Sequence, residues 1–306
     1  MPNKEIIQFK TIAAYHKAMD IPAPEHPLIS LIDYSEIGRP KLSPPVSLMM
    51  DCYCISIKRN FEHKFRYGQL RYDFDSGAML FGGPNQLFGI EVNPESKLKM
   101  EGWMLLIHPD FLWGTSLAKR IKQYEFFDYA VNEALFLSEK EEATMNQIVH
   151  NIQQEYRSNI DKFSKGIIIT HLENLLSYAE RYYNRQFLTR EKANHQILER
   201  LETFLAECFS SDQLLIKGLP TVQSVAEALN MSPGYLTDLL KVLTGQSTQQ
   251  HIHDKLIEKA KTQLSTTELS ISEIAYELGF EHPQSFTRLF KTKTNLSPLA
   301  FRASFN

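Results

Sequence analysis

The sequence predicts an α+β protein of several domains: a β-rich N-terminal domain, a helical hairpin and an all-α C-terminal domain with two helix–turn–helix units. Three observations predict this fold class. Short apolar runs between Gly, Pro, Asn and Asp residues fill the first part of the chain, as is typical of strands. Two long stretches with helical periodicity follow. A repeat of about 50 residues occupies the last third. We place the domains at residues 1–137, 138–186 and 196–306, with a linker at 187–195.

The first segment is expected to form a β-sandwich or a β-barrel. The runs "PPVSLMMDCYCISIKRN", "YDFDSGAMLFGGPNQ" and "WMLLIHPDFL" each place strand-forming residues between turn residues. Cys52 and Cys54 alternate with apolar and aromatic residues in "DCYCISI". We interpret them as small buried residues of a strand, with metal ligation or a redox pair as the alternative.

The composition indicates a soluble protein without a membrane span. The 306 residues carry a formal net charge of −3, with 43% hydrophobic and 23% charged residues. The longest apolar runs fall far short of the roughly 20 residues that a membrane helix needs, and the chain does not open with a secretory signal. The three cysteines show no disulfide-framework spacing. We therefore expect a cytoplasmic protein that makes no membrane contact.

Residues 138–186 are expected to form an antiparallel helical hairpin. Ser138 and Glu141 have the spacing of a capping box at the start of the first helix. Apolar residues then recur at three- and four-residue intervals: Met145, Ile148, Val149, Ile152 and Tyr156, and in the second helix Ile168, Leu172, Leu175, Leu176, Ala179, Tyr182 and Tyr183. This broad stripe can pack against the β-rich domain, or it can form the seam of a homodimer.

The last third of the chain contains the same unit twice. "VAEALNMSPGYLTDLLK" at 225–241 aligns with "IAYELGFEHPQSFTRLFK" at 274–291 when one residue is inserted at the turn. The alignment matches Val225 with Ile274, Leu236 with Phe286, and Leu240 with Phe290. Each copy is interpreted as helix, turn and helix, at about 222–243 and 271–292.

The second unit carries the chemistry of a DNA-reading helix. Its first helix buries Ile271, Ile274, Ala275 and Leu278, Gly279 ends that helix, and Pro283 opens the next one. The second helix places Phe286, Leu289 and Phe290 on one face. Its opposite face has Gln284, Ser285, Arg288 and Lys291. Arg can pair with guanine and Gln with adenine, while Ser and Lys can hold phosphates.

A helix over 247–265 is expected to join the two units, with Ile252, Leu256, Ile257, Ala260 and Leu264 along one stripe. About 18 residues at about 1.5 Å each span roughly 27 Å. Such a strut could place two recognition helices about one DNA turn apart, on successive segments of the major groove.

Over residues 196–304 the sequence resembles the AraC/XylS family of bacterial transcriptional regulators. The resemblance rests on "SVAEALNMSPGYLTDLLKVLTGQS", the linking helix and "ISEIAYELGFEHPQSFTRLFKTKTNLSPLAFR". It implies two helix–turn–helix units that bind double-stranded promoter DNA. We expect an activator that contacts RNA polymerase, with a repressor as the alternative. The resemblance also implies an N-terminal domain, often cupin-like, that senses a small-molecule effector or mediates formation of a homodimer.

Carried over by position, the resemblance implies two groups of DNA-binding residues. The second unit contributes His282, Pro283, Gln284, Ser285 and Arg288 by this match, and we add Thr287, Lys291 and Lys293 of the same helix as candidates. The first unit departs from this pattern, because its outward face has no Arg and consists of Gly234, Tyr235, Thr237, Asp238, Lys241 and Val242. Asp238 would repel phosphate or accept a hydrogen bond from cytosine N4. The first unit is therefore expected either to read bases or to dock on the DNA backbone.

The charge distribution is compatible with DNA binding despite the negative total. Residues 220–306 contain eight Lys/Arg and eight Asp/Glu, but between 282 and 302 Arg288, Lys291, Lys293 and Arg302 occur without any acidic residue. About four phosphate contacts per subunit would give modest, salt-sensitive binding. We therefore expect dimerisation to matter for affinity.

The alternative function is a cupin-type ligand-binding or metal-dependent enzyme domain fused to the DNA-binding module. The β-rich segment has no His-x-His spacing, and His251 and His253 have it on a helix, where they point apart. We therefore assign no catalytic residue, no metal and no cofactor. A ligand pocket remains an expectation; its candidates, which could equally cover a solvated sheet face, are His63, Arg66, Tyr67, Arg71 and Tyr72.

Overall fold

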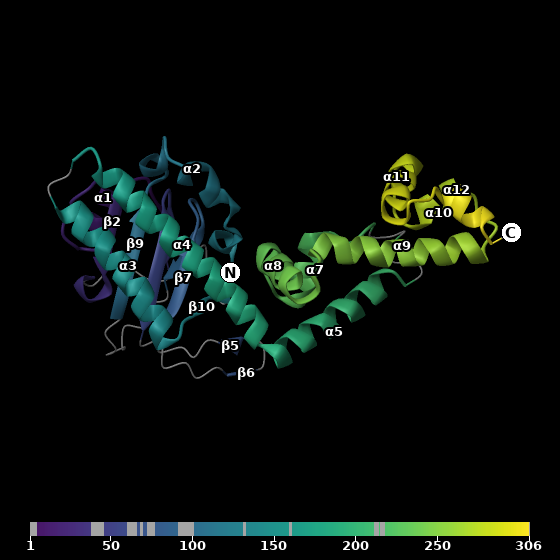
Figure 1. Cartoon of the computed structure of the whole chain (residues 1–306), viewed down its shortest axis with the longest axis horizontal. Coiled ribbons are helices and arrows are strands. Elements are labelled where there is room, and N and C mark those ends of the chain that lie inside the picture. Colours follow the sequence, from purple (N-terminus) through teal and green to yellow (C-terminus); the bar gives the residue numbers. More distant parts are fainter. Residues whose placement is uncertain are drawn as a thin grey trace. The chain divides into compact units, whose positions relative to one another are not determined.

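The computed structural model describes residues 5–37, 46–59, 66–67, 70–71, 77–90, 101–130, 133–158, 161–210, 214 and 218–305. The chain divides into two compact units, Met1–Gln186 and Phe187–Asn306, which Figure 1 colours from purple to teal and from green to yellow. Strands occur in the first unit, and the described part of the second unit is helical.

A five-stranded antiparallel sheet is the larger β element of the first unit. Its strand order is β10 (Leu135–Phe136), β7 (Ala78–Gly82), β4 (Tyr53–Arg59), β9 (Glu101–Ile107) and β2 (Ile29–Asp33). In the central strand β4, residues Tyr53 to Ile57 are all buried. Both faces of the sheet are therefore covered at its centre, which explains why the apolar run of β4 is continuous.

A smaller sheet and a core cluster complete the β-rich region. β1 (Glu5–Phe9) pairs in parallel with β3 (Val46–Met50), which pairs antiparallel with β8 (Leu87–Ile90). The buried cluster joins Phe9 and Leu48 of this sheet to Cys54 and Leu106 of the larger one, with Tyr15 of α1 (Ile12–Ala18) among them. Since the cluster draws on both sheets, the prediction of a β-rich N-terminal region is confirmed.

The remaining elements of this region are short. A two-stranded ribbon consists of β5 (Arg66–Tyr67) and β6 (Leu70–Arg71). The helical segments are η1 (Tyr34–Glu36), η2 (Pro109–Leu112), α2 (Leu117–Arg120), η3 (Ile121–Gln123) and η4 (Glu125–Asp128).

Cys52 and Cys54 are free and buried. Burial raises the pKa of both thiols to about 12, so both stay protonated at neutral pH and are poor nucleophiles and metal ligands. The interpretation as small buried residues is confirmed.

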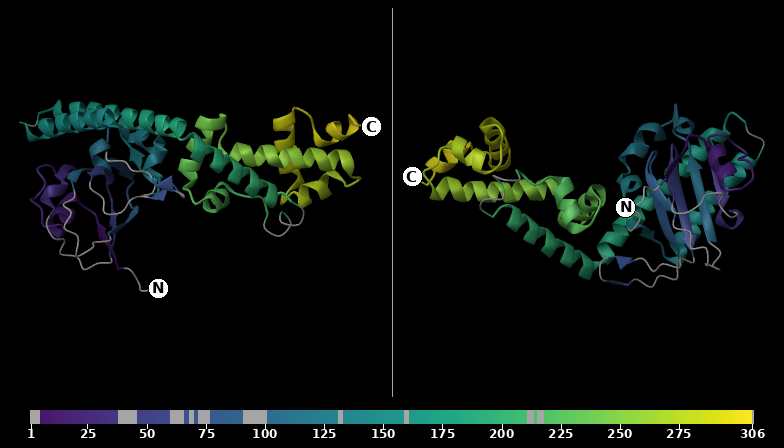
Figure 2. Two further views of the ribbon diagram at one scale, coloured as in Figure 1. Left: turned by 90° about the horizontal axis from the view of Figure 1, so that it is seen from below. Right: turned by 180° about the vertical axis from the view of Figure 1, so that it is seen from behind.

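Two long helices form the predicted hairpin, α3 (Glu139–Arg157) and α4 (Ser164–Thr189). They lie across one face of the five-stranded sheet (Figures 1 and 2). Ser138 and Glu141 form the expected capping box. Three hydrogen bonds fix α3 to the sheet, from Trp103 Nε1 to Asn146 Oδ1 at 2.8 Å, from Arg59 Nε to Glu142 Oε1 at 2.7 Å, and from the Leu31 amide to Tyr156 Oη at 3.3 Å.

The apolar stripe of the hairpin is buried inside this unit. All twelve residues that the periodicity singled out, from Met145 to Tyr183, are buried. Tyr183 of α4, for example, stacks on Phe126 with ring centroids 5.6 Å apart and touches Phe81 of β7. The stripe therefore packs against the β-rich region, and the alternative that it forms an exposed dimer seam is wrong.

The segment expected to be a linker, residues 187–195, is helical apart from one residue. α4 continues to Thr189, and α5 (Glu191–Cys208) begins after Arg190. Polar composition suggested a linker, yet the stretch contains neither Gly nor Pro to stop a helix. Buried contacts also hold it, since the Asn194 side-chain amide donates to the Phe187 carbonyl.

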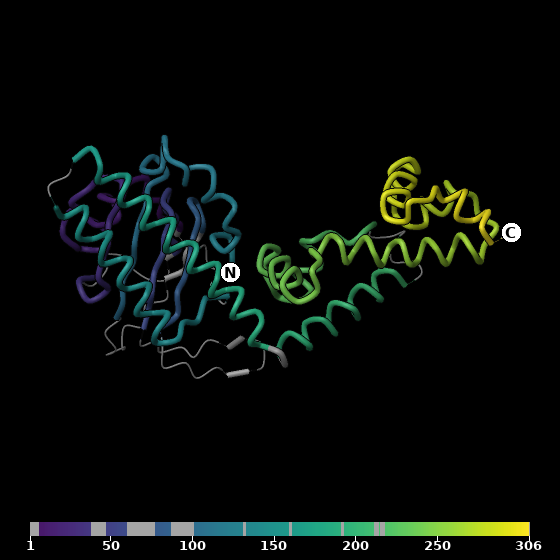
Figure 3. Tube along the Cα trace, in the orientation of Figure 1, coloured from purple at the N-terminus to yellow at the C-terminus, as the bar shows by residue number. Residues whose placement is uncertain are grey.

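The last six helices build the two predicted units around one central helix. The first unit is α7 (Val222–Leu229) and α8 (Pro233–Thr244), and the second is α10 (Ile271–Glu277) and α11 (Pro283–Thr294), followed by α12 (Pro298–Ala303). α9 (Thr248–Thr266) contacts each of these helices as well as α5, and Figure 3 shows it running between the two units. In the described part of the chain, no helix is long and apolar enough to cross a membrane.

Candidate nucleic-acid interface

The two helix–turn–helix units have closely similar turns. In the second unit the Phe280 amide donates to the Ala275 carbonyl at 3.0 Å, and in the first the Met231 amide donates to the Ala226 carbonyl at 2.9 Å. Each turn contains one residue in the left-handed region, Gly279 at φ +83° and Asn230 at φ +58°. Gly and Asn are the residues that adopt this conformation most readily. The repeat seen in the sequence is thus a repeat of backbone geometry.

Space as well as conformation requires a glycine at position 279. A Cβ there would lie 3.2 Å from the Leu219 amide nitrogen and 3.4 Å from the Leu214 carbonyl oxygen. The segment that precedes α7 therefore packs directly on the turn of the second unit, and a side chain at position 279 would force that segment to shift.

The recognition helix of the second unit, α11, has one buried and one exposed face. Phe286 and Phe290 are fully buried, and their rings are 5.8 Å apart. The residues on the opposite face are exposed: His282, Gln284, Ser285, Arg288 and Lys291. Pro283 and Thr287 are half-buried beside them. This exposed face has the donors and acceptors that base edges require.

Two of the four cations near α11 have partners within the chain. Lys293 Nζ lies 2.7 Å from Asp254 Oδ1 of α9, and Arg302 Nε donates to the Leu264 carbonyl at 3.2 Å. Arg288 and Lys291 make no side-chain hydrogen bond or ion pair with any residue that the structure describes. The expectation that all four cations lack acidic contacts is wrong for Lys293, because the partner comes from another helix 39 residues away.

The recognition helix of the first unit, α8, has less to offer DNA. Tyr235 was expected on its outward face but is only 1% exposed. It packs edge-on against Phe187 with ring centroids 5.1 Å apart. Because α8 begins at Pro233, Tyr235 falls four residues before Leu239 and joins the buried stripe. The assignment of Tyr235 to the DNA-facing surface is therefore a misassignment.

The other residues assigned to α8 are partly engaged. Gly234 is half-buried. Thr237 Oγ1 lies 3.1 Å from Thr248 Oγ1 at the start of α9. Lys241 Nζ lies 3.2 Å from Asp238 Oδ1 one turn earlier. Since this pair is neutral overall, α8 presents a smaller and less positive surface than α11.

The histidines of α9 take part in local hydrogen bonds. His251 Nε2 lies 2.9 Å from Thr244 Oγ1, and His253 Nε2 lies 2.8 Å from Gln249 Nε2. Burial lowers the pKa of both rings below the ordinary value. Among the described residues, no group of three His, Cys, Asp or Glu is arranged to hold a metal ion.

The expected ligand-binding residues lie largely outside the described part of the chain. His63 and Tyr72 are outside it. For Arg66, Tyr67 and Arg71 the structure gives the backbone, in which Arg66 pairs with Arg71 and Tyr67 with Leu70.

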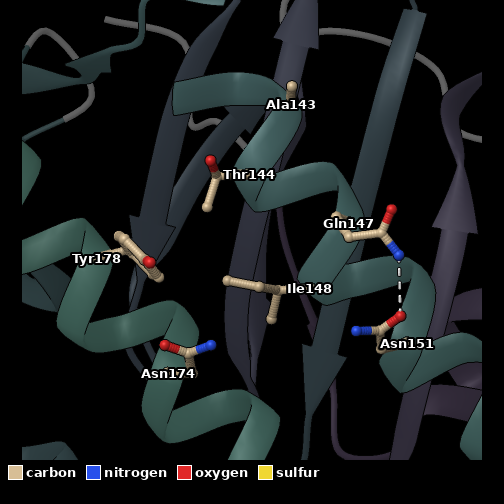
Figure 4. A pocket seen from close by; sticks show the side chains of 7 residues that line it. All are labelled: Ala143, Thr144, Gln147, Ile148, Asn151, Asn174 and Tyr178. Carbon is tan, nitrogen blue, oxygen red and sulfur yellow. Dashed lines mark hydrogen bonds between the residues drawn. The ribbon is translucent and has the colours of Figure 1, made fainter. Parts of the chain in front are cut away.

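A shallow depression of about 490 Å³ opens between α3 and α4 (Figure 4). It is lined by Ala143, Thr144, Gln147, Ile148, Asn151, Asn174 and Tyr178. A hydrogen bond of 3.0 Å from Gln147 Nε2 to Asn151 Oδ1 crosses its rim. The lining has amide and hydroxyl groups, which can form hydrogen bonds to a polar surface.

Known proteins are similar to this chain in its C-terminal part. Residues 225–304 match the family described as a helix-turn-helix domain. Over 82 residues, 27% of this chain and 28% of the relative, the sequence is 37% identical to the arabinose operon regulatory protein of Escherichia coli (strain K12). The C-terminal unit is an AraC-type helix–turn–helix domain. A second relative, the uncharacterized HTH-type transcriptional regulator YijO of the same organism, is 27% identical over 133 residues, 44% of each chain.

The AraC-type domain also has relatives among solved structures. The C-terminal domain of the two-component response regulator yesN from Fusobacterium nucleatum is 33% identical and is matched over 34% of this chain and 95% of that one, with a TM-score of 0.30. The chain spans less than half the length of the two curated relatives, 44% and 28%. The likeness to both of them therefore concerns part of the protein.

Sequence reasoning missed one side chain of this surface, Asp254. Its carboxylate bonds to Lys293 and to Gln246 Nε2, which is 2.8 Å away. On the sequence Asp254 is one acidic residue of a helix with mixed charges, and its two partners lie 8 residues before it and 39 after it. The repeat offered one indication: Asp254 lies on α9, the helix that joins the two helix–turn–helix units.

Proposed function

We propose that the chain is a sequence-specific DNA-binding regulator of transcription that reads promoter DNA with its AraC-type domain and catalyses no reaction. One observation carries the proposal: α11 exposes Gln284, Ser285, Arg288 and Lys291 on the face opposite its buried phenylalanines. A helix that served packing alone would need no particular chemistry on that side, whereas a major groove requires donors and acceptors there.

The two recognition helices have different tasks in this proposal. Arg288 and Gln284 read base edges, while Lys291 and Ser285 contact phosphates on either side. α8 docks on the backbone rather than reading bases, because Asp238 neutralises Lys241 and Tyr235 is buried. The base preference of the protein then comes mainly from the half-site under α11.

The N-terminal compact unit, Met1–Gln186, is proposed to regulate DNA binding. Two sheets enclosing one core are compatible with a cupin-like domain that holds a small-molecule effector, and an effector would act by shifting an equilibrium between DNA-competent and incompetent states. We also propose a homodimer and a contact with RNA polymerase in activation. With the hairpin stripe buried, the outer face of α3 and α4 around Asn151 and Tyr178 is the surface proposed for dimerisation.

The alternative of a metal-dependent enzyme domain has less support. The His-x-His spacing lies on α9, where His251 and His253 are held by Thr244 and Gln249. The two buried cysteines are kept protonated.

Selection from a pool of random duplex DNA tests the proposal. The full chain is expected to enrich one sequence pattern, and a variant with Gln284→Ala and Arg288→Ala is expected to lose the strongest positions of that pattern while still binding DNA non-specifically. The matched control is Lys10→Ala, which removes one positive charge from the N-terminal compact unit, Met1–Gln186. Failure of the wild-type chain to enrich any sequence would show that the proposed function is wrong.

A further inference from the structure

Asp254 of α9 is bonded to the second helix–turn–helix unit and to the segment that joins α8 to α9. It lies in the second turn of α9, which begins at Thr248. Its Oδ2 accepts a hydrogen bond of 2.8 Å from Gln246 Nε2, and its Oδ1 lies 2.7 Å from Lys293 Nζ. One carboxylate thus binds Lys293 of the second unit and Gln246, which lies between the first unit and α9.

Both partners are attached to the ends of recognition helices. Gln246 follows Gly245, the residue in the left-handed region at φ +75° that ends α8. Lys293 lies in the last turn of α11, one residue before its final residue Thr294. The two oxygens of Asp254 therefore connect the last turn of α11 with a residue two positions beyond the end of α8, and these are the helices that the proposed function places on DNA.

The neighbouring contacts reinforce this connection on the side of the first unit. His251, one turn before Asp254, bonds to Thr244, which is the last residue of α8. The bonds of Asp254 are charge-assisted, and they are short for that reason. Its pKa is lowered, because the hydrogen bond and the positive charge of Lys293 outweigh the opposing effect of burial. The carboxylate is thus charged at neutral pH.

Much of the remaining contact between the units and α9 is apolar, beside single polar bonds such as that from Gln263 Nε2 to Glu277 Oε2 at 2.7 Å. The buried side chains along α9 are Ile252, Leu256, Ile257, Ala260 and Leu264. Apolar packing is non-directional, so it resists separation of the units more than it resists a small rotation of one unit about α9. Directional bonds resist that rotation, and Asp254 makes two of them, one to α11 and one to the segment that follows α8.

We propose that Asp254 is a positioning residue that fixes the separation and relative rotation of α8 and α11, and thereby the half-site spacing that the protein accepts. The inference rests on the proposed function. It also assigns Lys293 to this contact rather than to a DNA phosphate. Lys291, two residues earlier and without a partner among the described residues, keeps the phosphate role.

The distance between the two helices tests the geometry without any DNA. Spin labels at Lys241→Cys and Lys291→Cys, in a full chain with Cys208→Ser, report the distribution of distances between α8 and α11. Cys52 and Cys54 are buried and stay unlabelled. Asp254→Ala is expected to broaden or shift the distribution, and Asp254→Asn, which keeps a hydrogen-bonding side chain, is expected to do so less. An unchanged distribution in Asp254→Ala would overturn the proposal.

Spacing preference tests the consequence for DNA. On a site obtained by selection, one base pair is inserted or removed between the half-sites, and affinities are compared. Asp254→Ala and Lys293→Ala are expected to reduce the wild-type preference for the original spacing by about threefold to tenfold, the size of coupling usual within one bonded network. Lys291→Ala is the matched control, expected to weaken all spacings equally and to lower the salt dependence.

The outcomes separate the two proposals. If wild-type protein enriches no DNA sequence, the proposed function fails, and the distance measurement still decides the geometry. If wild-type protein binds and Asp254→Ala keeps the full spacing preference, the role of Asp254 is overturned while the proposed function stands.

Discussion

Arg288 and Lys291 lie one turn apart on the exposed face of α11 and are expected to act differently on DNA. Arg has a rigid fork of donors that matches the two acceptors of guanine, whereas Lys is a compact point charge that suits a phosphate. Neither side chain is bonded to another described residue. Both are therefore available without first breaking a contact within the protein.

Arg288→Ala is expected to weaken specific binding by about 1–3 kcal/mol and to relax the preference at one base pair. Lys291→Ala should weaken binding to all sequences alike and reduce the salt slope by about one. Titrations at several salt concentrations, on the selected site and on each single-base variant, measure both effects. Unchanged affinity and base preference in Arg288→Ala would show that another face of the domain reads DNA.

Asp238 gives the second prediction at the scale of single residues. Its carboxylate lies 3.2 Å from Lys241 Nζ, so Asp238→Ala removes a charge that repels phosphate and releases a lysine. Binding should become tighter and more salt-dependent, with the base preference unchanged. If binding becomes weaker and the preference at a cytosine is lost, then Asp238 reads a base and the first unit is not limited to backbone docking.

The turns and the central helix show how whole elements set the geometry of the surface. α9 carries both units, and each unit is completed by a residue with positive φ between its helices. Local sequence determines much of this: Ser247 with Gln250 and Ser270 with Glu273 form the capping boxes that begin α9 and α10. Long-range contacts decide the rest.

Gly279→Ala is expected to destabilise the C-terminal unit by about 1–3 kcal/mol, because it adds steric conflict to backbone strain. The new Cβ would lie 3.2 Å from the Leu219 amide nitrogen. Gly245→Ala is the matched control: its φ is +75°, yet nothing lies within 4 Å of an added Cβ. It should cost about 1 kcal/mol. Urea unfolding followed by circular dichroism measures both, and equal losses would contradict the role given to the contact with Leu219.

The pH dependence of stability provides a prediction for α9. Burial lowers the pKa of His251, with Asp254 and Glu202 acting in the opposite direction. Above its ordinary pKa of about 6.5 the ring is neutral in both states. As the pH falls below that value, the unfolded chain binds the proton first, so stability decreases. His251→Gln should flatten the fall in melting temperature between about pH 7 and pH 5. Parallel curves for wild type and variant would contradict this.

At the scale of the whole molecule, contacts within helices were predictable and contacts between distant segments were not. The repeat, the helix boundaries and the burial of Phe286 and Phe290 follow from periodicity and capping residues that lie close together in sequence. The burial of Tyr235 depends on Phe187, and the pairing of Lys293 depends on Asp254. Neither partner could be identified from local pattern, because each is about 40–50 residues away and is brought close only by the fold.

The same limit explains the misjudged middle of the chain. A polar stretch with neither Gly nor Pro can be an exposed linker or the junction of two helices, and composition does not distinguish them. The buried hydrogen bonds of Gln186 and Asn194 stabilise the helical conformation of this stretch. The breadth of the hairpin stripe likewise suggested a second subunit, whereas the five-stranded sheet covers it within one chain.

The central claim is that one chain places two helix–turn–helix units on successive segments of the major groove. α9 has 19 residues, which at about 1.5 Å each is roughly 28 Å, close to one turn of DNA. Hydroxyl-radical footprinting of the wild-type protein on its selected site tests this claim directly. We predict protected patches on one face of the duplex whose centres lie about 10 base pairs apart, the half-site separation of one helical turn. A single protected patch, or protection without helical phasing, would contradict the account.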